Sequence, residues 1–324
     1  MTQPRRHRSL LSVLVAGVLL AAAACSTGNE TPSSSGGTTA GGGTAKCVIG
    51  MTQINQTAAF FAQMNEGVQA TAKSEGCEVT IANANNDSAR QNSDIENFVT
   101  QGVTGLIVVA IDVNGVAPAV KAARDKGIKV VAIDAKLADG TVETFVGVDN
   151  AKAGKEAADW MIQRKLVQAK SYGIVDAKNS FIQNQREDSF RKAVDAAGAK
   201  FTQSVSGDNV QEKAATAAQN LVTAQPNLDF VYTTGEPATV GASSALNPTG
   251  KTKIVGWDLT KEVIAGIDSG LVTAVVQQNP KQEGVEAVKE LKAILGGAAP
   301  KSFIDVPITI VTKENVDPYR AIFP

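Results

Sequence analysis

Short apolar runs alternate with longer amphipathic stretches from Lys46 to the end of the chain. The short runs are rich in Val and Ile without polar alternation, which is typical of parallel strands that are buried on both faces. The strands predicted in this way are Cys47–Thr52, Val79–Ala82, Gly105–Ile111, Ile128–Ile133, Phe145–Val148, Tyr172–Val175, Leu228–Thr233, Lys253–Trp257 and Leu271–Val276.

Stretches whose apolar residues recur with helical periodicity lie between these strands, and several of these stretches end at a glycine. Repeated strand–helix–strand units predict a doubly wound α/β fold with parallel sheets. About 280 residues of such structure exceed one hydrophobic core, so we expect two lobes. The predicted helices include Phe60–Ser74, Asp94–Gln101, Val116–Lys126, Ala151–Leu166, Arg186–Ala197 and Gln211–Ala224.

Polar side chains follow nearly every predicted strand at its carboxyl end. In open α/β sheets, ligands bind outside these ends. We interpret Asp112 and Asp149 as caps of the helices that follow them, because aspartate favours that position. The remaining set consists of carboxylates and amides: Gln53, Asn55, Asn83, Asn85, Asp134, Asp176, Glu236, Asp258, Gln277 and Gln278.

The chemistry of this set suits a neutral polyhydroxy ligand. Carboxylates accept the protons of sugar hydroxyls in charge-assisted hydrogen bonds. Aromatic rings cover the apolar C–H surfaces of a sugar, and Phe60, Phe61 and Trp257 lie near the strand ends. The pattern therefore predicts a site for a sugar or a polyol.

Composition excludes several other functions. The 324 residues have a formal charge of −1 and thus no basic surplus for binding nucleic acid. The one histidine, His7, lies in a segment that we expect to be removed, which excludes Ser-His-Asp catalysis and His-ligated metals from the mature protein. Asn83–Asp87 lacks the spacing of a calcium loop, and Gly41–Gly43 lacks the context of a phosphate loop. We expect neither a metal nor a cofactor.

The first residues have the pattern of an export signal. Three arginines within the first eight residues precede an apolar run from Leu10 to Ala24, which is short for a membrane span. A basic start, a short apolar run and small residues are typical of a secretory signal peptide. We therefore predict a signal peptide over residues 1–24.

Cys25 follows this run and resembles the acylated cysteine of a bacterial lipobox, although Ala22 stands where that pattern usually has leucine. The alternative is a cleaved signal with an incidental cysteine. Sixteen of the twenty residues 26–45 are Gly, Ser, Thr or Pro, a composition that cannot bury a core. We expect residues 25–45 to form a lipid-anchored flexible linker that holds the folded part at the outer face of the bacterial cytoplasmic membrane.

Two further cysteines, Cys47 and Cys77, begin the first and second predicted strands. In a doubly wound sheet these strands are parallel neighbours about 4.8 Å apart, a spacing that permits a disulfide. Export also favours an oxidised pair. We predict a structural Cys47–Cys77 disulfide at the amino end of the sheet, opposite the ligand cleft, and the alternative is two buried thiols.

Several motifs match one known family in order and spacing. The chain from Lys46 to about Val316 resembles the ribose-binding-protein family, the periplasmic-type solute receptors of bacterial sugar ABC importers. The motifs that carry the resemblance are Phe60–Phe61, Val130–Asp134, Gly147–Asn150, Arg186–Phe190, Val255–Asp258 and Gln277–Pro280.

The resemblance implies two doubly wound lobes joined by three hinge crossovers, the fold of a type I periplasmic binding protein. The crossovers are expected near Asp149, Gln278 and Val306. The implied N-terminal lobe comprises residues 46–149 and 279–306, and the C-terminal lobe comprises residues 150–278 and 307–324.

The resemblance also implies roles for individual residues. Phe60 and Phe61 would sandwich the sugar ring, although either could instead belong to the core. Asp134 and Asp258 would chelate hydroxyl pairs, and Gln278 would add an amide contact. Arg186 is either a further ligand contact or an anchor that fixes its helix to a neighbouring carboxylate.

Five residues depart from the pentose-binding pattern and belong to the predicted site or its border. Ala135 and Asn184 stand where that pattern has arginine. Gly235–Glu236 replaces an Asn-Asp pair, and Asn209 replaces an aromatic residue. The site is still recognisable as a sugar or polyol site, but these departures argue against ribose as its ligand. With Asn55, the positions Asn184, Asn209 and Glu236 complete the predicted ligand-binding set.

The functional prediction is a monomeric, lipid-anchored receptor that delivers a neutral monosaccharide or polyol to an ABC permease. One alternative is a sugar sensor that signals to a membrane kinase or chemoreceptor. A second alternative is a glycosidase with Asp134 and Asp258 as its carboxylate pair. The resemblance gives both aspartates a binding role, so we expect a binding protein and not an enzyme.

Overall fold

A computed structural model of the chain describes residues 46–56 and 58–323. The predicted signal peptide, the linker and the acylation of Cys25 lie outside these residues. Within the described part, no helix is both long and apolar enough to cross a membrane.

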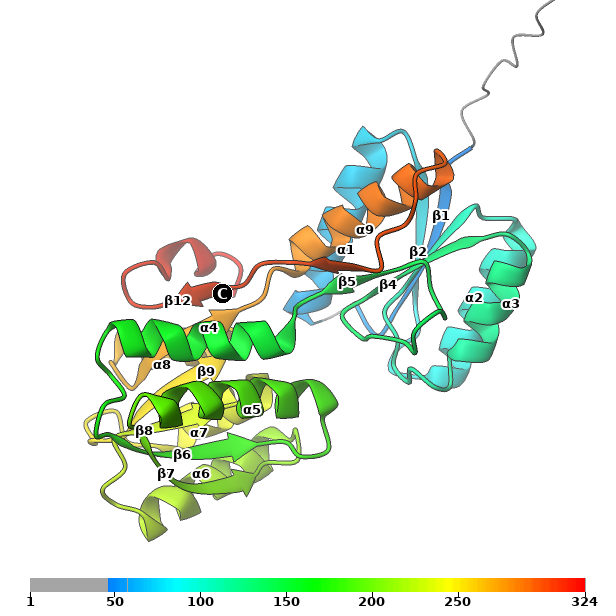
Figure 1. The fold of residues 1–324 in the computed structure, drawn as a ribbon. Coiled ribbons are helices and arrows are strands. Elements are labelled where there is room, and N and C mark those ends of the chain that lie inside the picture. The colour runs from blue at the N-terminus through cyan, green and yellow to red at the C-terminus, as the bar shows by residue number, and fades with distance from the viewer. Residues whose placement is uncertain (1–45, 57, 324) are drawn as a thin grey trace, which may run out of the picture. The chain divides into compact units, whose positions relative to one another are not determined.

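The first lobe is built on a sheet of six parallel strands with helices on both faces (Figure 1). Helices α1 (Ala59–Ser74) and α9 (Pro280–Leu295) pack together on one face, and α2 (Ser88–Gln101) and α3 (Ala117–Asp125) cover the other. The strand order is β11 (Phe303–Asp305), β5 (Thr144–Gly147), β4 (Lys129–Ile133), β3 (Gly105–Val108), β1 (Val48–Gln53) and β2 (Glu78–Asn83).

The second lobe repeats this arrangement, except that its edge strand β12 runs antiparallel to β10. Helices α4 (Asn150–Gln163) and α5 (Phe181–Ala196) cover one face. The other face carries α6 (Gln211–Ala224), α7 (Glu236–Ala245) and α8 (Lys261–Asp268). The strand order is β12 (Thr309–Val311), β10 (Val272–Gln277), β9 (Lys253–Trp257), β8 (Phe230–Thr233), β6 (Ser171–Asp176) and β7 (Lys200–Ser206).

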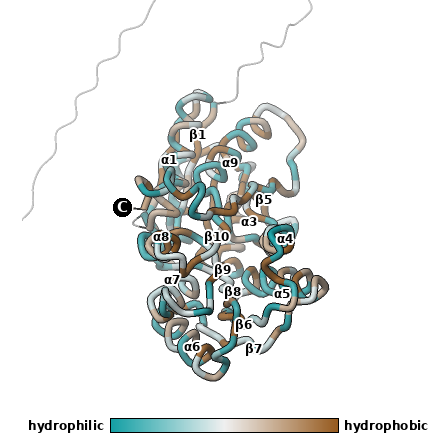
Figure 2. Tube along the Cα trace, turned by 90° about the vertical axis from the view of Figure 1, so that its left-hand side faces the viewer, coloured by the Kyte–Doolittle hydropathy of each residue, from teal (hydrophilic) through white to brown (hydrophobic). Residues whose placement is uncertain are grey.

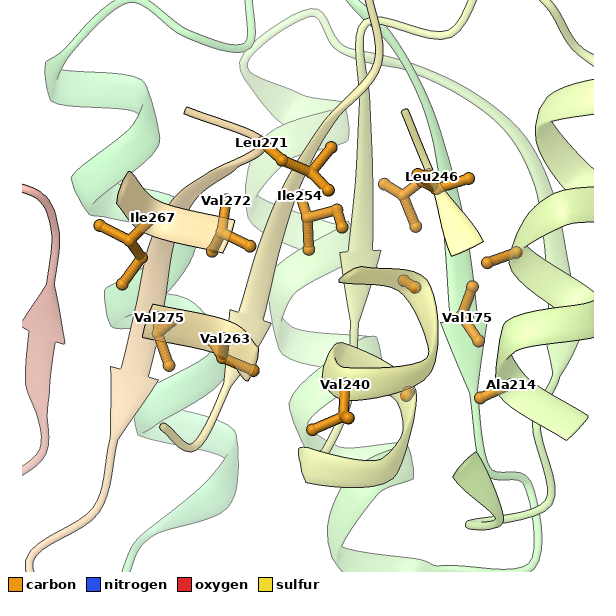
Figure 3. Packing of buried hydrophobic residues seen from close by; sticks show 14 of the residues in the cluster. Val175, Ala214, Val240, Leu246, Ile254, Val263, Ile267, Leu271, Val272 and Val275 are labelled. Carbon is orange, nitrogen blue, oxygen red and sulfur yellow. The ribbon is translucent and has the colours of Figure 1, made fainter. Parts of the chain in front are cut away.

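Each sheet lies between two hydrophobic layers. Figure 3 shows one of them, in which side chains of α7 and α8, such as Val240 and Val263, pack on strand residues that include Ile254 and Val275. Hydrophilic and hydrophobic residues alternate along the helices (Figure 2), as expected of helices that bury one face. This architecture confirms the predicted α/β fold with two doubly wound lobes.

The chain passes between the two sheets three times. Strand β5 of the first sheet is followed by α4, which packs against α5 in the second lobe. Strand β10 of the second sheet is followed by α9, which packs against α1 in the first. The third passage joins β11 to β12. A short 3₁₀ helix, η1 (Asp317–Tyr319), follows near the end of the chain.

Two glycines set the close packing of the helices that follow the first two passages. A Cβ at Gly154 of α4 would clash with the main-chain carbonyl of Arg186 on α5, and a Cβ at Gly284 of α9 would clash with that of Met64 on α1. The caps also match: Asp149 accepts from the Lys152 amide at the start of α4, and Asn279 caps α9 in the same way. The predicted cap role of Asp149 is confirmed.

The predicted helix cap at Asp112 is wrong. Its carboxylate accepts a hydrogen bond from the Asn114 amide at 2.9 Å and closes a turn before α3. The N-cap of α3 is Val116, which makes no side-chain cap bond, and a proline lies in the first turn of the helix. Because proline has no amide hydrogen, this first turn has one donor fewer to cap.

Six elements of the structure were not among the predicted ones. Strand β7 carries polar residues along an edge of its sheet and lacks the apolar run of a buried strand. Strands β11 and β12 have three residues each, which is too short for a pattern. The missing helices are α7, α8 and α9.

The Cys47–Cys77 disulfide is present, as predicted, with a Cα–Cα distance of 4.7 Å. The two cysteines precede β1 and β2, whose parallel register pairs Val48 with Glu78. Both sulfurs belong to residues buried in the cluster between the sheet and α1. The bridge therefore lies at the amino ends of the strands.

Candidate functional site

Asp134 and Asp258 occupy the same position in the two sheets. Asp134 directly follows β4 and Asp258 directly follows β9, the third strand in each strand order. Both have left-handed backbones, with φ of 63° and 60°, a conformation that aspartate tolerates better than most residues. Their amides donate to the next strand, Asp134 to Val146 O at 3.0 Å and Asp258 to Val276 O at 2.9 Å. Each lobe thus presents one carboxylate at the carboxyl end of a central strand.

Arg186 on α5 is fixed in place by partners from three other elements. Its Nε donates to Asn150 Oδ1 at 2.7 Å, and Nη1 donates to the Thr234 carbonyl at 3.1 Å. Its guanidinium stacks 3.7 Å from the ring centroid of Trp257, and the side chain is 3% exposed. The predicted anchor was a carboxylate, but the groups in direct contact with the Arg186 guanidinium are an amide, a carbonyl and an aromatic ring.

The charged groups at the strand ends of the two lobes influence one another electrostatically. Burial raises the pKa of both Asp134 and Asp258, and the charge of Arg186 counters that rise. Burial also lowers the pKa of Arg186, while Asp258 and Asp134 oppose that fall. One guanidinium thus lies within the electrostatic reach of two carboxylates, one from each lobe.

Gln278, in the second passage between the lobes, holds the Asp258 carboxylate. Its Nε2 donates to both carboxylate oxygens, at 3.0 and 3.1 Å. The neighbouring Gln277 has a structural role, because its side chain accepts from the Leu259 amide and donates to the Gln278 carbonyl. Of the two glutamines, Gln278 is the one whose side chain contacts a site carboxylate.

The aromatic residues divide into two groups. Phe60 and Phe61 are partly buried, with ring centroids 5.4 Å apart and planes at 90°, and both pack on the core of the first lobe. Trp257 has no exposed surface: Arg186 covers its ring, and its Nε1 donates to Tyr232 Oη at 2.7 Å. The expectation that Trp257 covers a ligand is therefore wrong, because its ring supports Arg186 instead.

Of the remaining predicted positions, Asn55 and Asn209 lie in loops after β1 and β7, and Asn184 lies in the first turns of α5. Asn55 accepts from the Ala58 amide at 3.0 Å and donates to Asn86. Asn184 donates to the Lys178 carbonyl, and Asn209 accepts from Gln183 Nε2 at 2.8 Å. These bonds shape the loops that follow the strands.

Glu236 and Asp176 have different surroundings. Glu236 begins α7, and burial together with the charge of Asp258 raises its pKa. Asp176 is buried at the end of β6, where Ser204 donates to it at 2.5 Å and Lys178 pairs with it at 3.2 Å. Asp176 therefore belongs to an ion-pair cluster of its own lobe.

Two pockets lined by residues of both lobes open beside the central groups. One has a volume of about 940 Å³, and Asp134, Asn150 and Gln185 line it. The other measures about 280 Å³, and Phe60, Glu236 and Asp258 line it. Each site aspartate thus borders a pocket.

The sequence analysis missed a further carboxyl, Glu283. It lies in the first turn of α9, is 0% exposed, and no described residue forms a hydrogen bond with either carboxyl oxygen. Its pKa is raised well above the usual range by burial, with Asp134 and Asp258 adding to the rise. The available signal was a glutamate on a helical stripe whose other members, apart from Glu290, lack polar side chains, as Ala287 and Leu291 do.

A metal site would need several His, Cys, Asp or Glu side chains close together. Among residues 46–56 and 58–323, no three His, Cys, Asp or Glu side chains come together as a metal site would need. The carboxylates of the site lie instead beside an arginine and a glutamine amide.

The family model described as "Periplasmic binding protein domain" matches residues 49–299. The chain belongs to this family. The ribose import binding protein of Bacillus subtilis is 30% identical over 267 residues, which are 82% of this chain and 87% of that protein. The D-ribose/D-allose-binding protein of Pseudomonas aeruginosa is 26% identical, over 78% of this chain and 85% of its own length.

Solved structures give the same result for the fold. The periplasmic ribose ABC transporter protein from Conexibacter woesei superposes with a TM-score of 0.80 at 25% identity, covering 87% of this chain and 97% of that one. A sugar-binding protein of an ABC transporter from Bacillus halodurans gives a TM-score of 0.77 at 22% identity, covering 85% and 100%. The family resemblance inferred from the motifs is confirmed.

Proposed function

We propose that the protein is an extracytoplasmic receptor that captures a neutral monosaccharide or polyol between its lobes and delivers it to an ABC permease. The carboxylates of Asp134 and Asp258, one from each sheet and both near Arg186, carry the proposal. Relatives described as ribose import and D-ribose/D-allose-binding proteins support the same ligand class.

The geometry provides complementary bonds for a sugar. Each aspartate can accept protons from two neighbouring hydroxyls, since a carboxylate has two oxygens and no proton to give. Arg186 uses Nε and Nη1 within the protein, and its remaining N–H groups can donate to a ligand oxygen. Phe60 lines the pocket beside Asp258 and can cover an apolar face of the ring.

Closure of the lobes on the ligand is part of the proposal. Three passages, between β5 and α4, β10 and α9, and β11 and β12, join the two sheets and serve as hinges. A ligand held by both aspartates favours the conformation in which both contacts form, so its binding energy shifts the population toward that state. The radius of gyration from small-angle scattering should fall on addition of saturating ligand, and an unchanged curve would contradict hinge closure.

Attachment to the membrane rests on Cys25 and the signal-like residues before it. A diacylated Cys25 with the linker of residues 25–45 would keep the receptor close to its permease. Mass spectrometry of the exported protein should find a lipid-modified N-terminal cysteine, and Cys25→Ala should release the protein from the membrane fraction. An unmodified N-terminus at another residue would contradict this part of the proposal.

The ligand class is tested by a thermal-shift screen with D-ribose, D-allose, D-arabinose and other neutral sugars and polyols. A ligand at one hundred times its Kd stabilises the folded state by about 2.7 kcal/mol, which raises the melting temperature by several degrees. Amino acids and peptides serve as the comparison panel. If only that panel raises the melting temperature, the sugar-binding proposal fails.

A further inference from the structure

Glu283 is a buried acid with no hydrogen-bond partner among the described residues. It is 0% exposed, and both its carboxyl oxygens are enclosed and unpaired. An unpaired polar group in the interior is destabilising, and more so when it is charged. Glu283 lies in the first turn of the helix that follows Gln278, whose side chain holds the Asp258 carboxylate, so a partner for the Glu283 carboxyl can arrive with the ligand.

The same helix contains a matched acid whose partners are complete. Glu290 is also buried, but Lys301 donates to it through its amide at 2.8 Å and its Nζ at 3.2 Å. Thr144 Oγ1 adds a third bond at 3.3 Å. Burial of a glutamate on α9 thus does not by itself leave the carboxyl unpaired.

The position of Glu283 links it to the site. Gly284, the next residue, packs directly on the main chain of α1, which holds this turn of α9 against the lobe. The charges that act on Glu283 are those of Asp134 after β4, Asp258 after β9 and Arg186 on α5. Glu283 therefore lies within electrostatic reach of all three central groups.

Other charged groups on the elements packed against α9 are near the surface. Glu66 on α1 pairs with Lys281 at 3.3 Å, Lys73 on α1 is exposed, and Lys129 on β4 is partly exposed. Strands β3 and β5, which also contact α9, carry no ionisable side chain.

These surroundings determine the protonation state of the Glu283 carboxyl. Burial raises the pKa of Glu283, the two aspartates raise it further, and Arg186 only partly opposes them. The helix dipole favours a carboxylate in the first turn, so burial and like charge are what hold the proton. A neutral carboxylic acid differs from the two aspartates in having a proton to donate.

Hydrogen-bond donors are scarce in this site. The aspartates only accept, Gln278 donates to Asp258, and Arg186 has already committed two donors. Sugar oxygens, and the ring oxygen above all, need donors to complete their bonds. We propose that Glu283 is a further ligand-contacting residue whose carboxylic acid donates its proton to an oxygen of the bound sugar.

This inference rests on the proposed function and adds a property to it. Since only the protonated acid donates, affinity should decline once the pH exceeds the pKa of Glu283 in the sugar-free protein, by about tenfold for each further unit until the acid also ionises in the complex. The decline is the opposite of what ionisation of Asp134 and Asp258 would cause, because their carboxylates are the better acceptors. The direction of the pH effect therefore separates the roles.

The experiment is calorimetric titration from pH 6 to pH 9 with D-ribose, D-allose and D-arabinose as probes. Wild type is compared with Glu283→Gln, whose amide donates at every pH, and with Glu283→Leu, which has no donor. Glu290→Gln is the matched control on the same helix. Chemical denaturation of each variant without sugar verifies that it is folded.

We expect the affinity of wild type and of Glu290→Gln to fall as the pH rises. Glu283→Gln should bind as wild type does at pH 6 with a flat profile, and Glu283→Leu should bind at least tenfold more weakly. Identical pH profiles for wild type and Glu283→Gln, wild-type affinity in Glu283→Leu, or affinity that rises with pH would overturn the role of Glu283 while leaving sugar binding intact. Failure of wild type to bind any probe would instead count against the proposed function, and the role of Glu283 would fall with it.

Discussion

The two lobes have one topology but contribute to the site in different ways. In the second lobe, Gln278 holds the carboxylate of Asp258, and Asn150 and Thr234 hold Arg186 over Trp257. In the first lobe, no hydrogen bond from a described residue reaches the carboxylate of Asp134. The second lobe is therefore the preorganised half of the site, and ligand contacts complete the first.

A second difference lies at the opposite ends of the strands. Cys47 and Cys77 precede β1 and β2 of the first lobe and form a disulfide. At the same positions of the second lobe, Lys170 and Ala199 precede β6 and β7. Main-chain hydrogen bonds join these two segments, from Lys200 N to Lys170 O at 2.8 Å and from Ala169 N to Gly198 O at 3.1 Å. The first lobe, in which no described residue donates a hydrogen bond to the Asp134 carboxylate, thus has the sheet that a disulfide fixes. The state of the carboxylate affects sugar binding, whereas the disulfide affects stability.

The largest effect is expected from Arg186→Ala. This change leaves the half-buried carboxylates of Asp134 and Asp258 without their shared cation, and it uncovers the ring of Trp257. Breaking such a buried charge set costs about 3–5 kcal/mol of stability, and we expect sugar binding to be lost to calorimetry.

Arg191→Ala is the control for this change, because Arg191 lies on the same helix and also stacks on an aromatic ring, that of Phe201. It should retain wild-type affinity. Sugar binding by Arg186→Ala near the wild-type level would show that the second lobe does not depend on this anchor.

Loss of the disulfide should separate stability from binding. The closed loop of 30 residues predicts a loss of roughly 3–4 kcal/mol in Cys47→Ser/Cys77→Ser. Amide hydrogen exchange should show the loss of protection in β1 and β2 and leave β6 and β7 unchanged. Sugar affinity should stay within a factor of two, and a large drop would contradict the structural role of the bridge.

Asp134→Ala and Asp258→Ala should each weaken binding by two or more orders of magnitude while the fold persists. Each removes charge-assisted bonds worth about 1.5–3 kcal/mol and leaves ligand hydroxyls unpaired. Calorimetry measures both. Unchanged affinity in one of the two variants would mean that only the aspartate of the other lobe holds the ligand. That result would contradict the proposal that both lobes bind the sugar.

The smallest effect concerns the pH dependence of stability without ligand. The pKa of Asp134 is raised in the folded state, so the folded protein binds more protons than the unfolded chain, and its unfolding free energy falls as the pH rises from about 4 through the raised value. Asp134→Asn should flatten this slope. Asp258→Asn should flatten it less, because Gln278 stabilises the charged form of Asp258. Urea denaturation between pH 4 and pH 7 checks the order, and the reverse order would contradict the difference between the lobes.

The sequence predicted the features that depend on residues close together in the chain. Apolar runs such as Val130–Ile133 identify buried parallel strands, and polar residues directly after them, such as Asp134 and Asp258, mark the ends where a ligand can bind. Edge strand β7 was missed because half-exposed strands lack that run. Helices α7 and α8, which follow β8 and β9, have only ten and eight residues, so their periodicity is short, and buried glutamates interrupt the apolar stripe of α9.

The environment of a side chain could not be predicted in the same way. Nothing local distinguishes Trp257, covered by an arginine from another element, from a tryptophan that faces a ligand. Glu283 and Glu290 lie seven residues apart on α9, yet only the folded structure gives one of them partners. Burial and pairing arise from contacts between distant segments, which a single sequence does not specify.

The most direct test of the account is a crystal structure of the complex with the sugar that raises the melting temperature most. We predict one sugar whose hydroxyls lie within hydrogen-bond distance of both the Asp134 and the Asp258 carboxylates, with Arg186 donating to it. A sugar that contacts the strand ends of one lobe alone, or that binds away from both aspartates, would contradict the central claim.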